Sequence, residues 1–160
     1  MKKILNIVFF LILSIFSFGR WEVDRNYNMI FTSSIKTEPS QNSILYIRKG
    51  NYENILNYHS FYIITDKYPA STIKFDDESI QKTKVKLITE HPIEFERVGI
   101  VNIYKPDEIY VLLIDNEIEI FKKSKTLKII YEDKNSTRCT LEFDITGLET
   151  EIKKIPAKIF

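Results

Sequence analysis

Short runs in which apolar and polar residues alternate constrain the fold of this chain more than any other feature. In the clearest run, Cys139, Leu141, Phe143 and Ile145 are apolar and the residues between them are polar. A strand points successive side chains to opposite faces, so this pattern predicts a strand with one buried face. Similar runs recur at 21–23, 29–35, 44–48, 54–58, 61–65, 73–75, 83–89, 99–104 and 127–131. They predict a mainly β protein, either an antiparallel β-sandwich or a partly open barrel.

Two segments carry helix signals, so we expect one or two short helices. The segment 107–123 follows Pro106, has acids in its first turn and ends in lysines, which favours a helix. Alternation over 117–120 leaves a hairpin open as the other interpretation of this segment. Near the C-terminus, Thr146 and Glu149 match a capping box. Helical spacing follows it at Leu148, Ile152 and Ile155.

The first nineteen residues have the layout of a secretory signal peptide. Lys2 and Lys3 precede an apolar run, 4–16, and the small residues Ser17 and Gly19 follow it. A permanent transmembrane helix needs roughly twenty apolar residues, so this run favours a cleaved leader, with an uncleaved anchor as the alternative. We expect 1–19 to be the leader and 20–160 to form a single β-rich domain. That domain would lie in the periplasm or be secreted, with no stable membrane span.

Charge and cysteine content exclude several classes of function. The chain holds 23 basic and 22 acidic residues, and removing Lys2 and Lys3 leaves 21 against 22. A dedicated nucleic-acid-binding protein would carry a basic excess, so we expect no nucleic-acid partner. One cysteine, Cys139, rules out a disulfide framework and a Cys-rich metal site. It lies on the apolar face of a strand, where we expect a small buried side chain, although pairing with another chain is an alternative.

The sequence predicts no catalytic, cofactor-binding or metal-binding residue. We expect His59 to be a polar turn residue, and the group Glu90, His91 and Glu94 matches no strong metal motif. The acidic segment 76–78 is interpreted as a solvated turn because the other ligands of a calcium loop are missing. Ser-x-x-Lys spacing brings a hydroxyl and an amine together only on a helix, whereas here it falls in strand or turn segments. It occurs at Ser33/Lys36, Ser71/Lys74 and Ser79/Lys82.

A cluster of tyrosines is the one candidate for a binding surface. Large contact area at low entropic cost makes tyrosine suitable for binding, whereas ordinary sheet surface is the competing explanation. The candidate residues are Tyr46, Tyr52, Tyr58, Tyr62 and Tyr68.

The order of several short motifs resembles that of the VasI-like exported bacterial proteins, which are associated with type VI secretion loci and prophages. The motifs are a start at Trp21-Glu22-Val23, then 45–48, 73–77 and 122–129, and a final Phe143-Asp144-Ile145-Thr146-Gly147-Leu148. The resemblance covers most of 21–155. It implies an exported accessory or binding protein and carries no catalytic residues.

Three hypotheses for the function follow. The first is an exported, non-catalytic accessory or binding protein of the bacterial envelope, with a protein or another envelope component as partner. The second is an inhibitor or immunity-type protein that blocks a wall-degrading or toxin enzyme through a loop. The third, a hydrolase, would build its site from scattered acids with His59 or His91.

Overall fold

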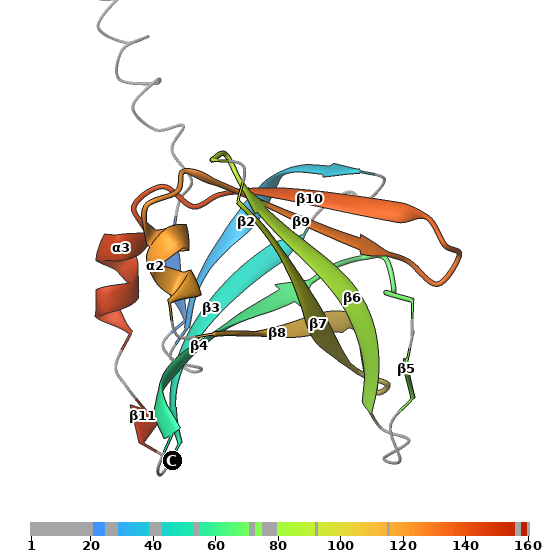
Figure 1. Ribbon diagram of the computed structural model, residues 1–160, viewed down its shortest axis with the longest axis horizontal. Coiled ribbons are helices and arrows are strands. Elements are labelled where there is room, and N and C mark those ends of the chain that lie inside the picture. The colour runs from blue at the N-terminus through green and yellow to red at the C-terminus, as the bar shows by residue number, and fades with distance from the viewer. Residues whose placement is uncertain are drawn as a thin grey trace, which may run out of the picture.

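Alternating strands build one large, mostly antiparallel sheet that rolls into a partly open barrel (Figure 1). The computed structural model describes residues 21–24, 29–38, 43–52, 55–70, 73–74, 80–91, 93–114, 116–155 and 158–159. The strands are β1 (Glu22–Asp24), β2 (Met29–Glu38), β3 (Ile44–Tyr52), β4 (Ile55–Ile64), β5 (Ile73–Lys74), β6 (Ile80–Thr89), β7 (Glu94–Asn102), β8 (Lys105–Leu113), β9 (Thr126–Glu132), β10 (Arg138–Asp144) and β11 (Lys158–Ile159). The mainly β prediction with short helices is confirmed.

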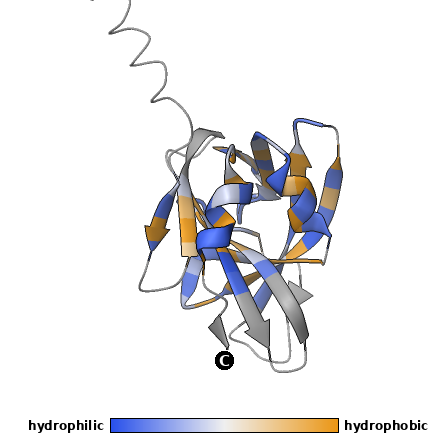
Figure 2. Ribbon diagram, turned by 90° about the vertical axis from the view of Figure 1, so that its left-hand side faces the viewer, coloured by the Kyte–Doolittle hydropathy of each residue, from blue (hydrophilic) through white to orange (hydrophobic). Residues whose placement is uncertain are grey.

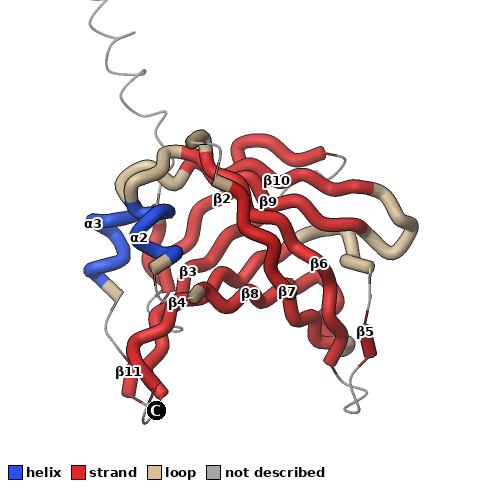
Figure 3. The backbone as a smooth tube through the Cα atoms, in the orientation of Figure 1, coloured by secondary structure: helices blue, strands red, loops and turns tan. Residues whose placement is uncertain are grey.

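Strand β2 brings the two ends of the sheet together. The strands follow the order β1-β2-β10-β9-β6-β7-β8-β4-β3-β11, and β5 pairs with β6. Residues Met29 to Ser33 of β2 pair with β3, whereas its residues from Ser34 to Glu38 pair with β10. Because β3 and β10 pair with different halves of β2, the sheet curls round without being sealed along its full length. Figure 3 shows the strands arching around a common interior.

The expected helix over 107–123 is wrong for most of its length. Its first part belongs to β8, and the helix that follows, α2 (Glu117–Lys122), has only six residues. Pro106 and the acids after it favour a helix start locally. Ile109, Val111 and Leu113, however, alternate and are buried, and β8 pairs with both β7 and β4. Tertiary pairing therefore overrides the local signal, and Pro106 occupies the second position of the strand, near its end.

Three further expectations about local structure need correction. The two strands expected at 54–58 and 61–65 are one strand, β4, so His59 is a strand residue and not a turn residue. The C-terminal helical turn, α3 (Leu148–Glu151) with the 3-10 turn η1 (Ile152–Lys154), lacks the capping box. Gly147 stands at its N-cap with a φ of 81° and makes no side-chain capping bond. The Thr146 N–H instead donates to Asp144 Oδ1 at 2.9 Å.

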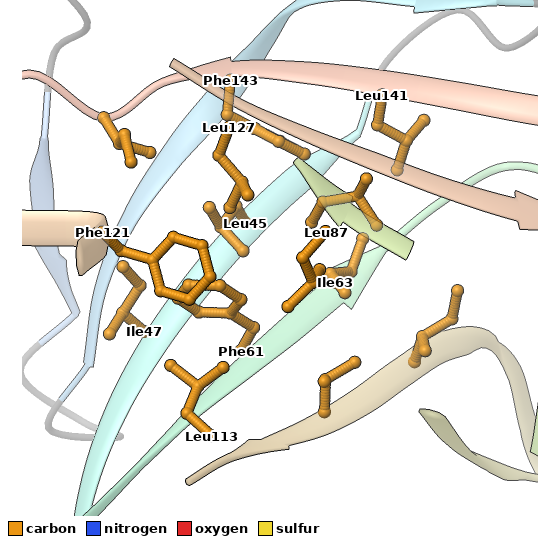
Figure 4. Packing of buried hydrophobic residues seen from close by; sticks show 14 of the residues in the cluster. Leu45, Ile47, Phe61, Ile63, Leu87, Leu113, Phe121, Leu127, Leu141 and Phe143 are labelled. Carbon is orange, nitrogen blue, oxygen red and sulfur yellow. The ribbon is translucent and has the colours of Figure 1, made fainter. Parts of the chain in front are cut away.

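The inward side chains of the strands form one continuous hydrophobic core, and α2 covers it at one end (Figure 4). The alternation of hydropathy along the strands is visible in Figure 2. Phe121 of α2 is fully buried, and its ring lies 5.0 Å from Phe61 and 5.6 Å from Phe95. Leu148, Ile152 and Ile155 are also buried, as their helical spacing predicts. No helix among the described residues has the length and apolar character needed to cross a bilayer.

Replacing Phe121 tests whether α2 is an essential part of the core. We expect Phe121→Ala to lower the free energy of unfolding by about 3–5 kcal/mol, because it removes a buried ring and leaves a cavity. Urea unfolding followed by fluorescence measures the change. The matched control, Lys123→Ala, alters an exposed side chain just after the same helix and should change stability by less than about 0.5 kcal/mol. Equal, small effects for both variants would show that α2 is not integral to the core.

Candidate functional site

Exposed apolar side chains gather on the β7–β8 hairpin. The described residues include nine exposed large hydrophobic side chains, and six of them lie on this hairpin or just after it. We call these six the hairpin surface: Val98 (50% exposed), Ile100 (38%), Ile103 (36%), Tyr104 (80%), Leu112 (50%) and Ile114 (62%). Single exposed apolar residues are normal on protein surfaces, but a gathering of them marks a candidate interaction site.

Strand geometry explains why these side chains point outward. Gly99 and Val111 face the core as a cross-strand pair, and the neighbouring pair, Ile100 and Tyr110, therefore faces solvent. The same register puts Val98 and Leu112 at one level on the outer face. A Cβ at Gly99 would lie 2.6 Å from Ile109 Cγ2, so the glycine permits the close packing beneath.

An aromatic row continues from the hairpin surface across the neighbouring strands. Tyr110 is paired in register with Tyr62, Tyr62 with Tyr46, and Tyr46 with Phe31. The ring centroids of Tyr46 and Tyr62 are 5.9 Å apart with an edge-on geometry, and those of Phe31 and Tyr46 are 5.1 Å apart. These are distances at which aromatic pairs stabilise a sheet. The row therefore fixes the orientation of the outer side chains next to the hairpin.

Polar side chains border the hairpin surface on both of its sides. On the β6 side, Lys82 pairs in register with Ile100, and Lys84 with Val98. On the β4 side, the partners of Leu112 and Tyr110 are the uncharged Ser60 and Tyr62. Burial, and then a hydrogen bond with Glu108, raise the pKa of Tyr62 well above its ordinary value. The tyrosine hydroxyl therefore stays protonated and neutral.

An ion pair fixes the base of the hairpin to α2. Arg97 Nη2 contacts Glu117 Oε1, and Arg97 Nε donates to Glu117 Oε2 at 3.2 Å. Glu117 Oε2 also accepts the Ile114 N–H at 2.9 Å. The Glu117 side chain is only 8% exposed. A buried, multiply bonded pair of this kind holds its neighbours in one geometry, here the end of β8 and the start of α2.

A groove of about 770 Å³ adjoins the hairpin surface. It runs over the outer side of β6 and is shared with β7, β9 and β10. Val98 and Lys84 line both the groove and the edge of the hairpin surface. Its other charged lining residues are Lys86, Glu96, Arg97, Glu132 and Arg138. Lys86 also forms an ion pair with Glu94. The groove is thus a charged recess beside an apolar surface.

Among the candidate tyrosines, the side chains of Tyr46, Tyr62 and Tyr68 are described, and the structure brings two of these three together. Tyr46 and Tyr62 are cross-strand neighbours in the aromatic row. Tyr68 lies by the β9–β10 turn. Lys134 Nζ lies over its ring, 4.7 Å from the ring centroid. Tyr52 is the last residue of β3 and Tyr58 lies within β4, and the side chains of both are outside the described residues. Tyr68 lies apart from the other two because the chain leaves β4 after Ile64 and runs to another part of the sheet.

The two histidines lie in different surroundings. His59 is half-buried on the inner face of β4, and its nearest charges are Lys122, Lys49 and Glu119. His91 is 73% exposed in the turn after β6, with its Nε2 4.0 Å from Glu90 Oε1. Glu90 accepts the N–H groups of Lys125 and Thr126, so its carboxylate holds the chain before β9. Among the described residues, no group of three or more His, Cys, Asp or Glu side chains is placed to hold a metal ion.

Cys139 is buried on the inner face of β10, as its apolar strand position predicts. Burial raises the pKa of its thiol, which keeps the sulfur in the unreactive protonated form. The segment 1–19, where the sequence predicts a leader, and the acidic segment at 76–78 fall outside the described residues. The same holds for one or more side chains of each Ser-x-x-Lys pair.

Sequence reasoning missed the hairpin surface, although a signal for it was present. Residues 109–114 form an unbroken apolar run, and Ile100 lies between Gly99 and Val101. A strand with one solvated face should alternate, so an unbroken run indicates a strand that is apolar on both faces. The ambiguity between helix and hairpin at 107–123 hid this conclusion.

Comparison with known proteins found no match among protein-family models, curated proteins or solved structures. The resemblance to VasI-like proteins therefore stays a hypothesis.

The position of His59 predicts a specific dependence of stability on pH. Burial, and then the charges of Lys122 and Lys49, lower the pKa of His59 from 6.5 to about 4. Between these values the unfolded chain binds a proton that the folded chain does not, so stability falls as the pH falls through this window. We expect His59→Gln to lose less stability than the wild type between pH 6.5 and 4, as measured by urea unfolding. An equal loss in both proteins would contradict this account.

Proposed function

We propose that this protein is an exported, non-catalytic binding protein of the bacterial envelope and that it contacts its partner through the hairpin surface. The observation that carries the proposal is the clustering of six of the nine exposed large hydrophobic residues, among those described, on one hairpin. Such clustering is typical of surfaces that are covered in a complex, because leaving them in water forgoes burial free energy.

The surroundings of the hairpin surface also favour binding. Val98, Ile100 and Leu112 stand on strands that are paired on both sides, so their backbone is already ordered before a partner arrives. A surface held in its bound geometry loses little conformational entropy on association. The neighbouring row of Tyr62 and Tyr110 adds the side-chain type that is enriched at interfaces.

The sequence supplies the expected location and context. The leader-like segment 1–19 supports export, to the periplasm or beyond it. The resemblance to VasI-like proteins supports an accessory role in association with a secretion apparatus.

A charged substitution in the hairpin surface tests the proposed function. We expect Leu112→Asp to reduce recovery of the partner from envelope extracts by at least about tenfold, because a carboxylate would be buried without a counter-charge. Quantitative pull-down with the purified chain measures the recovery. The matched control is Ile93→Asp, which alters an exposed apolar residue (40% exposed) before β7 and outside the surface.

Both variants should unfold at the same urea concentration as the wild type to within a few tenths of a molar unit. Unchanged recovery with Leu112→Asp would contradict the proposed surface. Hydrolase activity of the wild type on envelope polymers would contradict the proposed non-catalytic role.

We propose an inhibitor or immunity-type function as a second candidate, because an exposed aromatic side chain stands at the tip of the hairpin. Tyr104 is 80% exposed at the β7–β8 turn, and its N–H donates to Asn102 Oδ1 at 2.8 Å, which orders the turn. An exposed aromatic side chain on an ordered turn has a shape suited to insertion into an enzyme cleft.

Inhibition of wall-degrading enzymes tests this second candidate. If it is correct, the wild type inhibits a muramidase of the envelope, and Tyr104→Ala weakens the inhibition constant by about tenfold or more. Tyr68→Ala, at an exposed tyrosine elsewhere (44% exposed), is the matched control and should leave inhibition unchanged. Absence of inhibition across a panel of muramidases and toxins would exclude this function in favour of the first.

A further inference from the structure

Nitrogen-bearing side chains from three elements meet at the end of the barrel that α2 covers. Lys49 of β3 and His59 of β4 are a cross-strand pair on the inner face of the sheet. Lys122 of α2 is near enough to His59 to act on its charge, and so is Lys49. We call Lys49, His59 and Lys122 the basic cluster.

We propose that the basic cluster is a binding site for an oxyanion of the phosphate type. The cluster faces the inner side of the sheet at the α2 end, whereas the hairpin surface stands on the outer face of β7 and β8. The two sites are separate. This inference therefore goes beyond the proposed function and does not depend on it.

The core layer next to the basic cluster explains how its members are brought together. Phe61 pairs in register with Ile47, and its ring centroid lies 5.0 Å from that of Phe121 (Figure 4). Residues two apart in a strand share a face, so Lys49 follows Ile47 on the inner side, and His59 precedes Phe61 there. The lysine of α2 comes directly after Phe121. The buried layer thus fixes all three backbone positions of the cluster.

The positive charges of the basic cluster exceed the negative charge near them. Glu119 is the acid that acts on His59, and its Oε1 lies 2.5 Å from Lys122 Nζ. The Glu119 side chain is 55% exposed, whereas that of Lys122 is 17% exposed. Lys49 forms no ion pair with any residue that the structure describes. Two ammonium groups therefore share one outlying carboxylate, and an anion from outside would supply the missing negative charge.

The imidazole of His59 provides a donor that the protein itself does not use. Within the described part of the chain, no hydrogen bond involves this half-buried side chain. Burial, and then the charges of Lys122 and Lys49, lower its pKa to about 4, so at neutral pH the ring is uncharged and keeps one N–H donor. An anion that accepts this N–H beside two ammonium groups would be partly removed from water, which strengthens each attraction.

The types of donor favour a tetrahedral oxyanion over a carboxylate. Arginine matches a planar carboxylate with two parallel bonds, whereas lysine binds phosphate as a point charge. Arg97, which also lies at this end of the barrel, is bonded to Glu117. The donors that are left come from β3, β4 and α2, so they approach a ligand from different directions. Oxygens that point in different directions, as in phosphate, suit this arrangement.

Titration with inorganic phosphate, followed by the NMR signals of the histidine rings, tests the proposal. The chain has two histidines, and their signals are assigned with His59→Gln. The titration is done at pH 7 and constant ionic strength on the wild type, Lys49→Gln, Glu119→Gln and Lys134→Gln. The Lys134 control removes an exposed charge in the β9–β10 turn, away from α2 (Figure 1).

We expect a saturable shift of the His59 signals in the wild type. Lys49→Gln should weaken phosphate binding about threefold to tenfold, because one of two ammonium groups is lost. Glu119→Gln should strengthen it severalfold, because the competing carboxylate is removed from Lys122. Lys134→Gln should bind like the wild type. Acetate should bind more weakly than phosphate to all four proteins.

A second arm follows the pKa of His59 with and without anion. A bound anion favours the charged imidazole, so saturating phosphate should raise this pKa by about one unit. Sulfate, which does not titrate in this range, should give the same rise. Glycerol 3-phosphate identifies the source of the ligand. Tighter binding than inorganic phosphate would indicate a phosphate ester, and weaker binding the free ion.

The contrary outcomes are specific to the basic cluster. A His59 signal that does not shift, or that shifts without saturation, would overturn the proposal. Equal affinities of Lys49→Gln and Lys134→Gln would do the same, and acetate binding as tightly as phosphate would exclude the phosphate class. If Lys49→Gln unfolds at lower urea than the wild type, Glu119→Gln decides, because unchanged or weaker phosphate binding by this variant also contradicts the site. None of these results bears on partner recovery through the hairpin surface.

Discussion

The alternation of side chains along a strand is the constraint on which the rest of the structure depends. Each inward residue of β8, such as Ile109 or Val111, forces its neighbours to the outer face. The sequence places Tyr110 and Leu112 at these outer positions, where polar residues would satisfy the fold equally well. Burying a side chain such as Leu112 would contribute about 1.5–3 kcal/mol, and the folded chain forgoes much of this contribution. Folding alone does not account for that choice, whereas the proposed association with a partner would account for it.

The barrel also provides the rigidity that a binding surface requires. The β7–β8 hairpin is paired with β6 on one side and with β4 on the other, so neither of its strands is an edge of the sheet. Arg97 and Glu117 tie its base to α2, and Phe121 of α2 packs into the core below. The outer side chains thus stand on a backbone that pairing, an ion pair and packing hold in place. The hairpin surface and the core are therefore held together through β7 and β8, which contribute side chains to both.

The sequence predicts those parts of the fold that depend on neighbouring residues, and it fails where the structure depends on pairing between distant strands. The alternation at 127–131 and 139–145 predicted β9 and β10, and their apolar residues are buried as expected. Pro106 and the acidic residues after it led to a wrong prediction of a helix over 107–123. Helix propensity is a local property, whereas β8 is stabilised by pairing with strands that are distant in the sequence. The arrangement of the tyrosines depends on distant pairing in the same way. Tyr46 and Tyr62 meet only through the β3–β4 register, and Tyr110, their neighbour in space, is far away in the sequence.

Hydroxyl-radical footprinting of the chain inside and outside the cell envelope tests the central claim most directly, because it reports the solvent exposure of individual side chains. Tyr104 and Leu112 are exposed in the free chain, as is Tyr68 near the β9–β10 turn. The account predicts that oxidation of Tyr104 and Leu112 falls severalfold in envelope preparations compared with the purified protein, while oxidation of Tyr68 stays the same. Equal oxidation of all three side chains in both preparations would contradict the claim that the outer face of this hairpin is covered by a partner.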